Sequence, residues 1–172
     1  MRYIDAVKTV SYHFKKARVI HALAGGLAFS IHSGPRTTLD IDIIVQRDTP
    51  EELIEECFRK VFRDFYRSGE TLRYGLLDSS RYVGIDEDGV ELVVDILKLS
   101  NPDYEKKLFR RTFMVPLEGR KINFIGREDL VVMKSVSSKK QDKLDAEMLL
   151  HNYGRRLNYK YINIWLRHAG CK

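Results

Sequence analysis

Two aspartates separated by one residue, Asp40 and Asp42, have the clearest potential for chemistry in this chain. They open an otherwise apolar run that ends Ile43-Ile44-Val45 and is predicted to form a strand. Because side chains alternate between the two faces of a strand, both aspartates would point the same way. Neighbouring carboxylates repel each other and lose hydration, so they need a compensating charge. A hard divalent cation with oxygen ligands is the natural candidate.

A pair of glycines, Gly25 and Gly26, precedes the aspartates and follows the apolar run Val19-Ile20-His21-Ala22-Leu23. We expect a strand over residues 19–24, a tight turn at the glycines and a short helix over about 27–32. Glycine lets the backbone come close to a ligand, and the N–H groups at a helix start favour an anion. The turn would offer phosphate-binding amides and the next strand would offer carboxylates. Together they predict a site for a magnesium nucleotide.

A third carboxylate, Asp95, lies inside a later apolar segment over residues 91–97. This segment is predicted to be a strand, and an acid at its centre is costly unless it has a partner. A metal ion held by Asp40 and Asp42 would be such a partner. The acidic run Asp86-Glu87-Asp88 before the segment is instead predicted to be a hairpin turn with hydrated carboxylates.

The combined motif is a Gly-Gly turn, thirteen intervening residues, Asp-Ile-Asp, and a third acid on a later strand. It resembles the active-site motif of the DNA polymerase-β-like nucleotidyltransferase superfamily. The run from Arg36 to Asp42 is most similar to small stand-alone bacterial and archaeal members, which include minimal nucleotidyltransferases and abortive-infection type toxins. The resemblance implies an α+β (α/β) nucleotidyltransferase fold, in which helices pack on a mixed sheet and further helices form the C-terminal part. It also implies transfer of a nucleoside monophosphate from an NTP such as ATP to a hydroxyl group of a small molecule, protein or RNA.

The family mechanism assigns roles to these residues. Asp40 and Asp42 would hold two Mg²⁺ ions that bridge the nucleotide phosphates, and Asp95 would ligate the second ion and accept the proton of the attacking hydroxyl. Gly25 and Gly26 would present backbone N–H groups to the phosphates. Many relatives have serine where Gly26 stands, so nearby residues such as Ser30 would gain importance, or nucleotide binding would be weaker.

Basic residues near the motif have two interpretations each. Arg36 could reach the triphosphate, or it could pair with Asp40 or another acid and hold the loop. Lys134 matches a lysine on a helix of the small nucleotidyltransferases, and Lys139, Asp142 and Asp145 loosely match the basic-acidic run that follows it. The alternative for this group is a solvated helix face with i,i+3 pairing.

His32, at the end of the short helix, is predicted to be a packed or capping side chain and not a catalyst. The other histidines have no spacing that suggests a metal site.

The remaining pattern predicts a single domain over residues 1–172 with its C-terminal helices from about residue 127. Helices are predicted over residues 3–16, 51–66, 101–110, 130–136, 139–153 and 159–167, and further strands over 72–77, 80–85, 112–115 and 121–124. The helix over 51–66 carries an apolar stripe that would cover the sheet. Its start is marked by Asp48-Thr49-Pro50-Glu51-Glu52, which supplies a cap, a proline and two acids.

Composition narrows the class of protein further. No apolar run reaches the roughly 18 residues of a membrane span, and the N-terminus lacks a signal-peptide core, so we expect a cytoplasmic protein without membrane contact. Cys57 and Cys171 are not expected to form a disulfide. The net charge of +6 is compatible with nucleotides or nucleic acid, or with a merely solvated basic surface. Scarce glutamine and abundant Lys, Arg and Glu favour a thermophilic source.

Two alternatives to catalysis on a free acceptor remain at this point. The chain could be the nucleotide-binding component of a toxin–antitoxin or abortive-infection pair and act with a partner protein. It could also bind nucleotides without catalysing transfer, an alternative suggested only by the missing serine.

Overall fold

The computed structural model describes residues 1–170. Its helices are α1 (Tyr3–Lys16), α2 (Gly25–Ser33), α3 (Glu51–Phe58), α4 (Pro102–Arg110), α5 (Arg127–Val136), α6 (Lys140–Tyr153) and α7 (Tyr159–His168), with a 3₁₀ turn over Gly154–Arg156. Its strands are β1 (His21–Leu23), β2 (Asp40–Val45), β3 (Asp64–Arg67), β4 (Leu72–Tyr74), β5 (Leu77–Ile85), β6 (Glu91–Leu99), β7 (Phe113–Leu117) and β8 (Arg120–Phe124).

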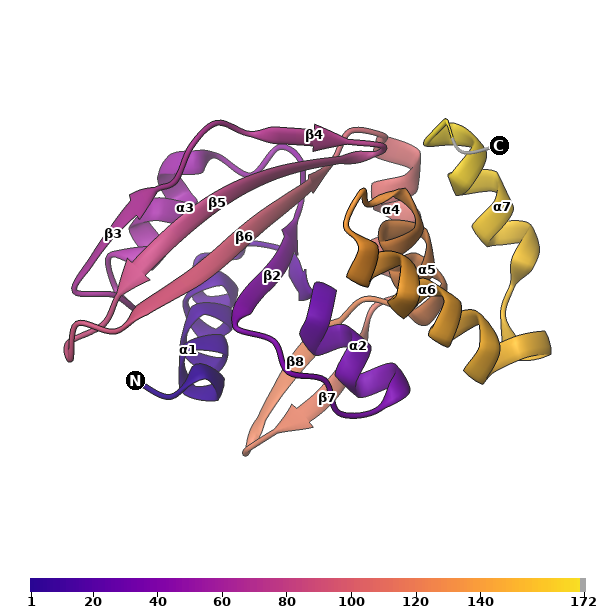
Figure 1. Ribbon diagram of the computed structural model, residues 1–172. Coiled ribbons are helices and arrows are strands. Elements are labelled where there is room, and N and C mark those ends of the chain that lie inside the picture. Colours follow the sequence, from indigo (N-terminus) through magenta and orange to yellow (C-terminus); the bar gives the residue numbers. More distant parts are fainter. Residues whose placement is uncertain (171–172) are drawn as a thin grey trace.

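The strands form one mixed sheet of eight strands in the order β3-β5-β6-β2-β1-β8-β7, with β4 paired to β5. β2 runs parallel to β6 and β1 parallel to β8, and the other neighbouring strands are antiparallel. Figure 1 shows the long β5–β6 hairpin on one side of β2 and the C-terminal helices α5, α6 and α7 on the other. The predicted mixed sheet with packed and C-terminal helices is confirmed.

Helix α2 lies at the junction of the sheet and the C-terminal helices. It contacts β2, which follows it in the chain, and also α5 and α6. Helices α1 and α3 contact each other elsewhere, and α1 also contacts β1 and β8. The glycine pair at the start of α2 is therefore placed where the sheet meets the α5–α6 pair.

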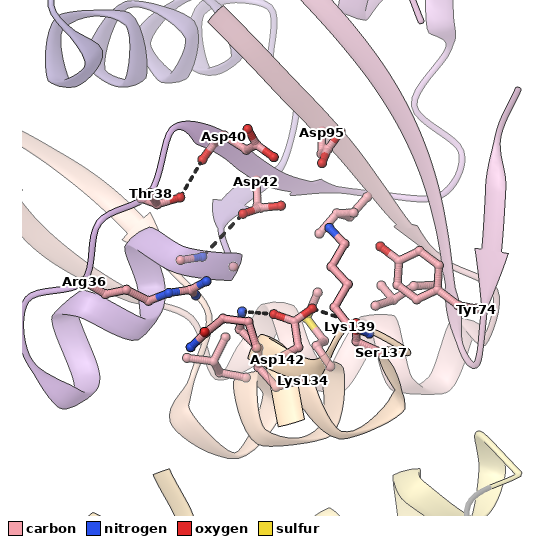
Figure 2. A pocket seen from close by; sticks show the side chains of 17 residues that line it. Arg36, Thr38, Asp40, Asp42, Tyr74, Asp95, Lys134, Ser137, Lys139 and Asp142 are labelled. Carbon is pink, nitrogen blue, oxygen red and sulfur yellow. Dashed lines mark hydrogen bonds and ion pairs between the residues drawn. The ribbon is translucent and has the colours of Figure 1, made fainter. Parts of the chain in front are cut away.

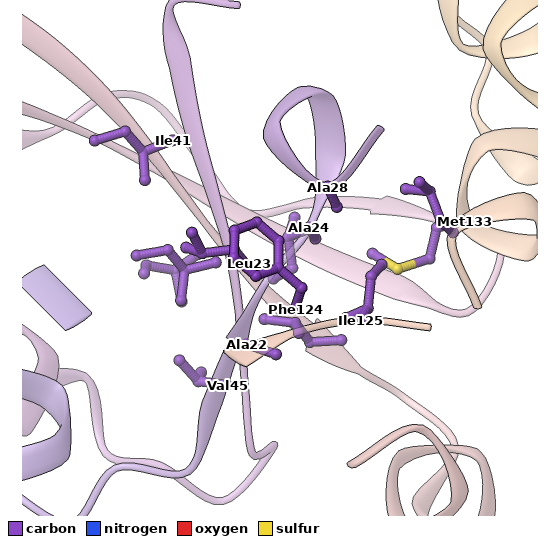
Figure 3. Packing of buried hydrophobic residues seen from close by; sticks show 14 of the residues in the cluster. Ala22, Leu23, Ala24, Ala28, Ile41, Val45, Phe124, Ile125 and Met133 are labelled. Carbon is purple, nitrogen blue, oxygen red and sulfur yellow. The ribbon is translucent and has the colours of Figure 1, made fainter. Parts of the chain in front are cut away.

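The core explains why β2 must alternate. Ile41 and Ile43 are 1% and 0% exposed, so their side chains are fixed in the core, and the alternating residues Asp40 and Asp42 turn to the opposite face. Figure 3 shows this packing around Leu23 of β1 and Phe124 of β8, which pair in register. Slipping β2 by one residue would bury both aspartates in this cluster and expose the isoleucines.

The helix predicted over residues 51–66 is wrong in its second half. Helix α3 ends at Phe58, and β3 then pairs antiparallel with β5, so that Phe65 lies opposite Gly84. A Cβ atom at Gly84 would lie 2.6 Å from the ring of Phe62, so glycine allows this ring to pack flat on the sheet. The apolar spacing continued at helical intervals, but backbone pairing with β5 and ring packing stabilise the strand instead.

The acidic turn before β6 is also only partly as expected. The turn itself is present, and Glu87 and Asp88 are exposed. Asp86 is 2% exposed, because its carboxylate accepts the backbone N–H groups of Asp88 and Val90 at 2.9 and 2.8 Å. It therefore organises the turn, and the prediction that all three acids are hydrated is wrong.

Two further expectations concern the chain as a whole. No helix among residues 1–170 has both the length and the apolar character that crossing a membrane requires. Cys57 is buried with a free thiol, and Cys171 lies outside the described residues.

Candidate active site

The three predicted acids meet on one face of the sheet. The parallel register of β2 and β6 places Asp42 directly beside Asp95 and Asp40 beside Val93. All three aspartates line one cavity together with Gly25 and Gly26 (Figure 2). Asp95 is 5% exposed, whereas Asp40 and Asp42 are partly buried. The three acids that the sequence pattern singled out therefore lie together at one cavity.

Asp42 carries the least compensated charge of the three. Its one side-chain hydrogen bond is accepted from the backbone N–H of Gly26 at 3.4 Å, and none of the ion pairs among residues 1–170 includes it. Burial raises the pKa of Asp42 to about 6, and the charge of Asp95 adds to this effect. Any cation that enters the cavity would therefore stabilise the ionised form of Asp42.

Gly25 is required by this arrangement for two reasons. Its φ of +55° lies in the left-handed region, which side chains disfavour. A Cβ atom at this position would also lie 1.8 Å from Oδ2 of Asp42, which is no possible contact. The glycine thus brings the start of α2, whose first N–H groups have no partner within the helix, against the carboxylate.

Gly26 is crowded by a hydroxyl group from the other side of the loop. A Cβ atom at this position would lie 2.7 Å from Oγ1 of Thr38. Thr38 itself donates to the backbone oxygen of Asp40 at 3.2 Å. The hydroxyl expected from a serine at position 26 is thus replaced in space by Thr38, which also lines the cavity.

Arg81 is the main residue of this site that the sequence reasoning missed. It lies on β5 opposite Asp95, and its Nε and Nη2 donate to the two carboxylate oxygens of Asp95 at 2.8 and 2.7 Å. Nη2 also donates to Asp40 at 3.2 Å. These bonds raise the pKa of Arg81 above its usual range. The sequence signal was a cation in the strand predicted over residues 80–85, but its register against Asp95 was unknown.

Arg81 determines which of the three carboxylates already have a counter-ion. Within residues 1–170, no three His, Cys, Asp or Glu side chains converge as a ready-made metal site. Asp40 and Asp95 instead share the Arg81 guanidinium, and only Asp42 is left over. The site as it stands is one of three acids and one arginine.

The opposite wall of the cavity is a network of buried ion pairs between α5 and α6. Lys134, 6% exposed, pairs with Asp142 and with Asp145 at 3.0 Å. Ser137 also donates to Asp142 at 2.6 Å. Asp145 is 1% exposed, so Lys134, Asp142 and Asp145 form no solvated helix face, whereas Lys139 of the same predicted group is exposed.

Arg36 joins the same network from the loop before β2. Its Nη1 donates to Oδ2 of Asp145 at 2.5 Å, which is the loop-holding alternative with an acid other than Asp40. Ser30 lies away from the cavity that the aspartates line. Its hydroxyl donates to the backbone oxygen of Gly26 at 3.1 Å and accepts the N–H of Arg36 at 3.2 Å, so it braces the loop.

Lys139 and Tyr74 complete the rim of the cavity. Lys139 was matched only loosely to the basic-acidic run of the family, and Tyr74 was not predicted. Lys139 is exposed, points toward the carboxylates in Figure 2, and belongs to none of the ion pairs among residues 1–170. Tyr74, on β4, lines the cavity, and burial raises its pKa. His32 is a packed side chain as expected: its Nε2 lies 3.0 Å from the backbone oxygen of Ile125, and burial lowers its pKa.

Solved structures with this fold are known, at low sequence identity. ANT(2″)-Ia, solved in complex with adenylyl-2″-tobramycin, superposes with a TM-score of 0.61 at 10% identity, over 97% of this chain and 96% of its own. An antigenic nucleotidyltransferase-like protein from Paracoccidioides brasiliensis gives a TM-score of 0.57 at 13% identity, over 98% and 92%. The lincosamide antibiotic adenylyltransferase LnuA, with lincomycin bound, gives 0.53 at 16% identity, over 84% and 94%. At these identities the likeness establishes the fold.

Sequence comparison establishes the family. No curated protein matches the chain significantly. The profile of a family described as "Nucleotidyltransferase of unknown function (DUF6036)" matches residues 2–153. The chain therefore belongs to this nucleotidyltransferase family and has the nucleotidyltransferase fold.

Proposed function

We propose that the protein is a magnesium-dependent nucleotidyltransferase that transfers a nucleoside monophosphate from an NTP to a hydroxyl group. The observation that carries the proposal is the meeting of Asp40, Asp42 and Asp95 opposite the Gly25-Gly26 start of α2. Two proteins of the same fold point to this reaction. ANT(2″)-Ia is solved in complex with adenylyl-2″-tobramycin, and LnuA is described as a lincosamide antibiotic adenylyltransferase. Their acceptor chemistry motivates the search for a hydroxyl acceptor of this chain.

The donor set fits Mg²⁺. Carboxylate oxygens are the ligands that this ion prefers, and Asp42 offers one charge that belongs to no ion pair among residues 1–170. The Arg81 side chain, which balances the other two acids, is 41% exposed and is not locked in the core. Asp40, Asp42 and Asp95 would hold the ions. Bound there, magnesium would neutralise phosphate charge and align an in-line displacement.

The chain's own residues supply the remaining functions. The N–H groups of Gly25 and Gly26, at the positive end of α2, bind phosphate oxygens. Lys139 provides a cation at the rim that is not committed to an acid. Asp95 accepts the proton of the attacking hydroxyl. Arg36 and Lys134 support the site indirectly. Both are paired with acids and hold the wall of the cavity.

A nucleotide-binding protein without catalysis is the second candidate. The observation that favours it is Arg81, whose guanidinium holds two of the three carboxylates. Such a protein would bind NTPs but release no pyrophosphate with any acceptor. Membership of a toxin–antitoxin or abortive-infection pair stays a prediction from the resemblance.

The test is a transfer assay with each of the four NTPs, Mg²⁺ and a panel of hydroxyl acceptors: aminoglycosides, lincosamides, proteins and RNA ends. Pyrophosphate release and the mass of the acceptor are measured. We expect a nucleotidyl adduct with the unaltered protein, none with Asp42→Asn, and an unchanged yield with Asp103→Asn, an exposed acid on α4. An adduct that persists in Asp42→Asn, or an NTP bound without turnover on any acceptor, would contradict the proposal.

A further inference from the structure

Arg81 occupies the coordination space of the acid cluster. Its forked guanidinium takes one lone pair from each oxygen of Asp95 at 2.8 and 2.7 Å, and Nη2 takes a third from Asp40 at 3.2 Å. A guanidinium keeps its proton at any physiological pH, so these bonds can only be broken by moving the side chain. Oxygens that bind Arg81 in this way are poorly placed to bind a second cation.

The same arginine also balances the charge of the cavity. Three carboxylates converge there, and Arg81 is the only cation in ion-pair contact with any of them among residues 1–170. Without it, Asp40, Asp42 and Asp95 would repel one another across the paired strands β2 and β6. Arg81 is therefore needed as a counter-ion only while no other cation occupies the carboxylate cluster.

The arginine can leave without disturbing the core. Its side chain is 41% exposed, whereas that of its partner Asp95 is 8% exposed. The strands on both sides of β5 are fixed by backbone pairing, so only side-chain torsions have to change. A guanidinium that turns outward regains water, and Asp95 stays in position.

We propose that Arg81 is a resident counter-ion of the metal-free site, which stabilises the cluster of Asp40, Asp42 and Asp95 and which magnesium must displace. Arg81 is thus a positioning residue that sets the magnesium concentration at which the site fills. This inference rests on the proposed function, because it requires that the three acids bind the ion. It implies that removing the arginine tightens magnesium binding and weakens the metal-free fold.

The experiment measures thermal unfolding during a titration with MgCl₂ alone, without nucleotide, for the unaltered protein and for Arg81→Ala. In EDTA the variant melts below the unaltered protein, because the three acids lose their counter-ion. As magnesium is added, its melting temperature rises further, and the half-effect falls at about tenfold lower magnesium, a typical size for the coupling of two ligands. Arg81→Lys, which keeps the charge but loses the fork, falls between the two. It also serves as the test if the alanine variant does not fold.

The matched control is Arg73→Ala. Arg73 also makes a forked pair with one carboxylate, to Asp78 at 2.7 and 3.2 Å, but it is exposed and outside the cavity. Its loss leaves the magnesium response unchanged.

The outcomes separate the two proposals. If the unaltered protein responds to magnesium and the Arg81 variants respond equally or more weakly, the inference is overturned and the proposed function stands. If no protein in the series responds, the magnesium site itself is wrong. If only the Arg81 variants respond, the inference holds, and the magnesium-dependent function of the unaltered protein is contradicted.

Discussion

Asp42 shows how a functional residue can oppose stability. It accepts one long hydrogen bond from Gly26, lies beside Asp95, and has a pKa raised to about 6 by burial and by that neighbour. Its burial and the neighbouring charge of Asp95 destabilise the ionised form in the metal-free fold, and the hydrogen bond from Gly26 offsets this only in part. They are tolerated where a cation is to be bound, because the same features increase the gain from binding it.

We therefore expect Asp42→Asn to stabilise the protein in EDTA while it abolishes nucleotidyl transfer. An amide oxygen can still accept the Gly26 N–H, but the repulsion with Asp95 is removed, which is worth on the order of 1 kcal/mol. Urea unfolding in EDTA measures the difference. Asp103→Asn, outside the site, should unfold like the unaltered protein. An Asp42→Asn variant less stable than the unaltered protein would show that the charge is already compensated.

The pair α5–α6 forms the second wall of the cavity through buried charges. Lys134 reaches Asp142 and Asp145, and Arg36 ties the loop before β2 to the same Asp145. The network connects the loop that follows α2 with helices far along the chain. Its integrity therefore decides how the glycine turn sits against the carboxylates.

Replacing Lys134 by methionine should lower the free energy of unfolding by about 3 kcal/mol, since Asp142 and Asp145 lose their shared cation inside the protein. Lys140→Met is the control, because Lys140 lies on the exposed side of α6 and should change stability by less than about 0.5 kcal/mol. Chemical unfolding of the two variants measures both values. Equal stability of Lys134→Met and the unaltered protein would mean that this network is not held in solution.

How far the sequence predicts these elements depends on the range of the interactions. Asp40 and Asp42 could be placed on one face because alternation within a strand is a local property, fixed by buried neighbours such as Ile41 and Ile43. Asp95 could be assigned to the same site only through the resemblance to the family motif, because its place beside Asp42 depends on the register of β2 against β6. Arg81 could not be placed, because its position opposite Asp95 depends on the register of β5 against β6.

Two other predictions depended on packing between distant segments. The burial of Lys134 and Asp145 follows from the contact of α5 with α6, which their spacing along the chain does not reveal. The end of α3 at Phe58 was missed for the same reason, since pairing of β3 with β5 overrides the helical spacing of residues 61–65.

The whole molecule combines a sheet that presents carboxylates with a helical C-terminal part that presents buried charges. As a result, several titratable side chains of the helical part are buried. Asp129, at the start of α5, is 0% exposed, and burial raises its pKa to about 6 despite bonds from Tyr161 and Arg111. The α5–α7 contact therefore contains an acid whose ionisation costs stability at neutral pH.

The pH dependence of stability follows from this sign. The folded protein protonates Asp129 near pH 6, whereas the unfolded chain does so only near about pH 4. Its contribution to the free energy of unfolding therefore rises as the pH falls between these values. Asp129→Asn keeps an acceptor for Tyr161 but loses the titration. Urea unfolding at about pH 7 and pH 5 should show a smaller change for the variant than for the unaltered protein, and equal changes would contradict the assignment.

The proposed metal site is tested most directly by locating a metal ion in crystals grown with Mn²⁺ and a non-hydrolysable ATP analogue. The proposed function predicts an anomalous-scattering peak between Asp40, Asp42 and Asp95, at about 2.0–2.1 Å from their carboxylate oxygens, with the phosphates against Gly25 and Gly26 and Arg81 turned away from Asp95. A nucleotide bound elsewhere, or bound with no metal peak at these three acids, would contradict it.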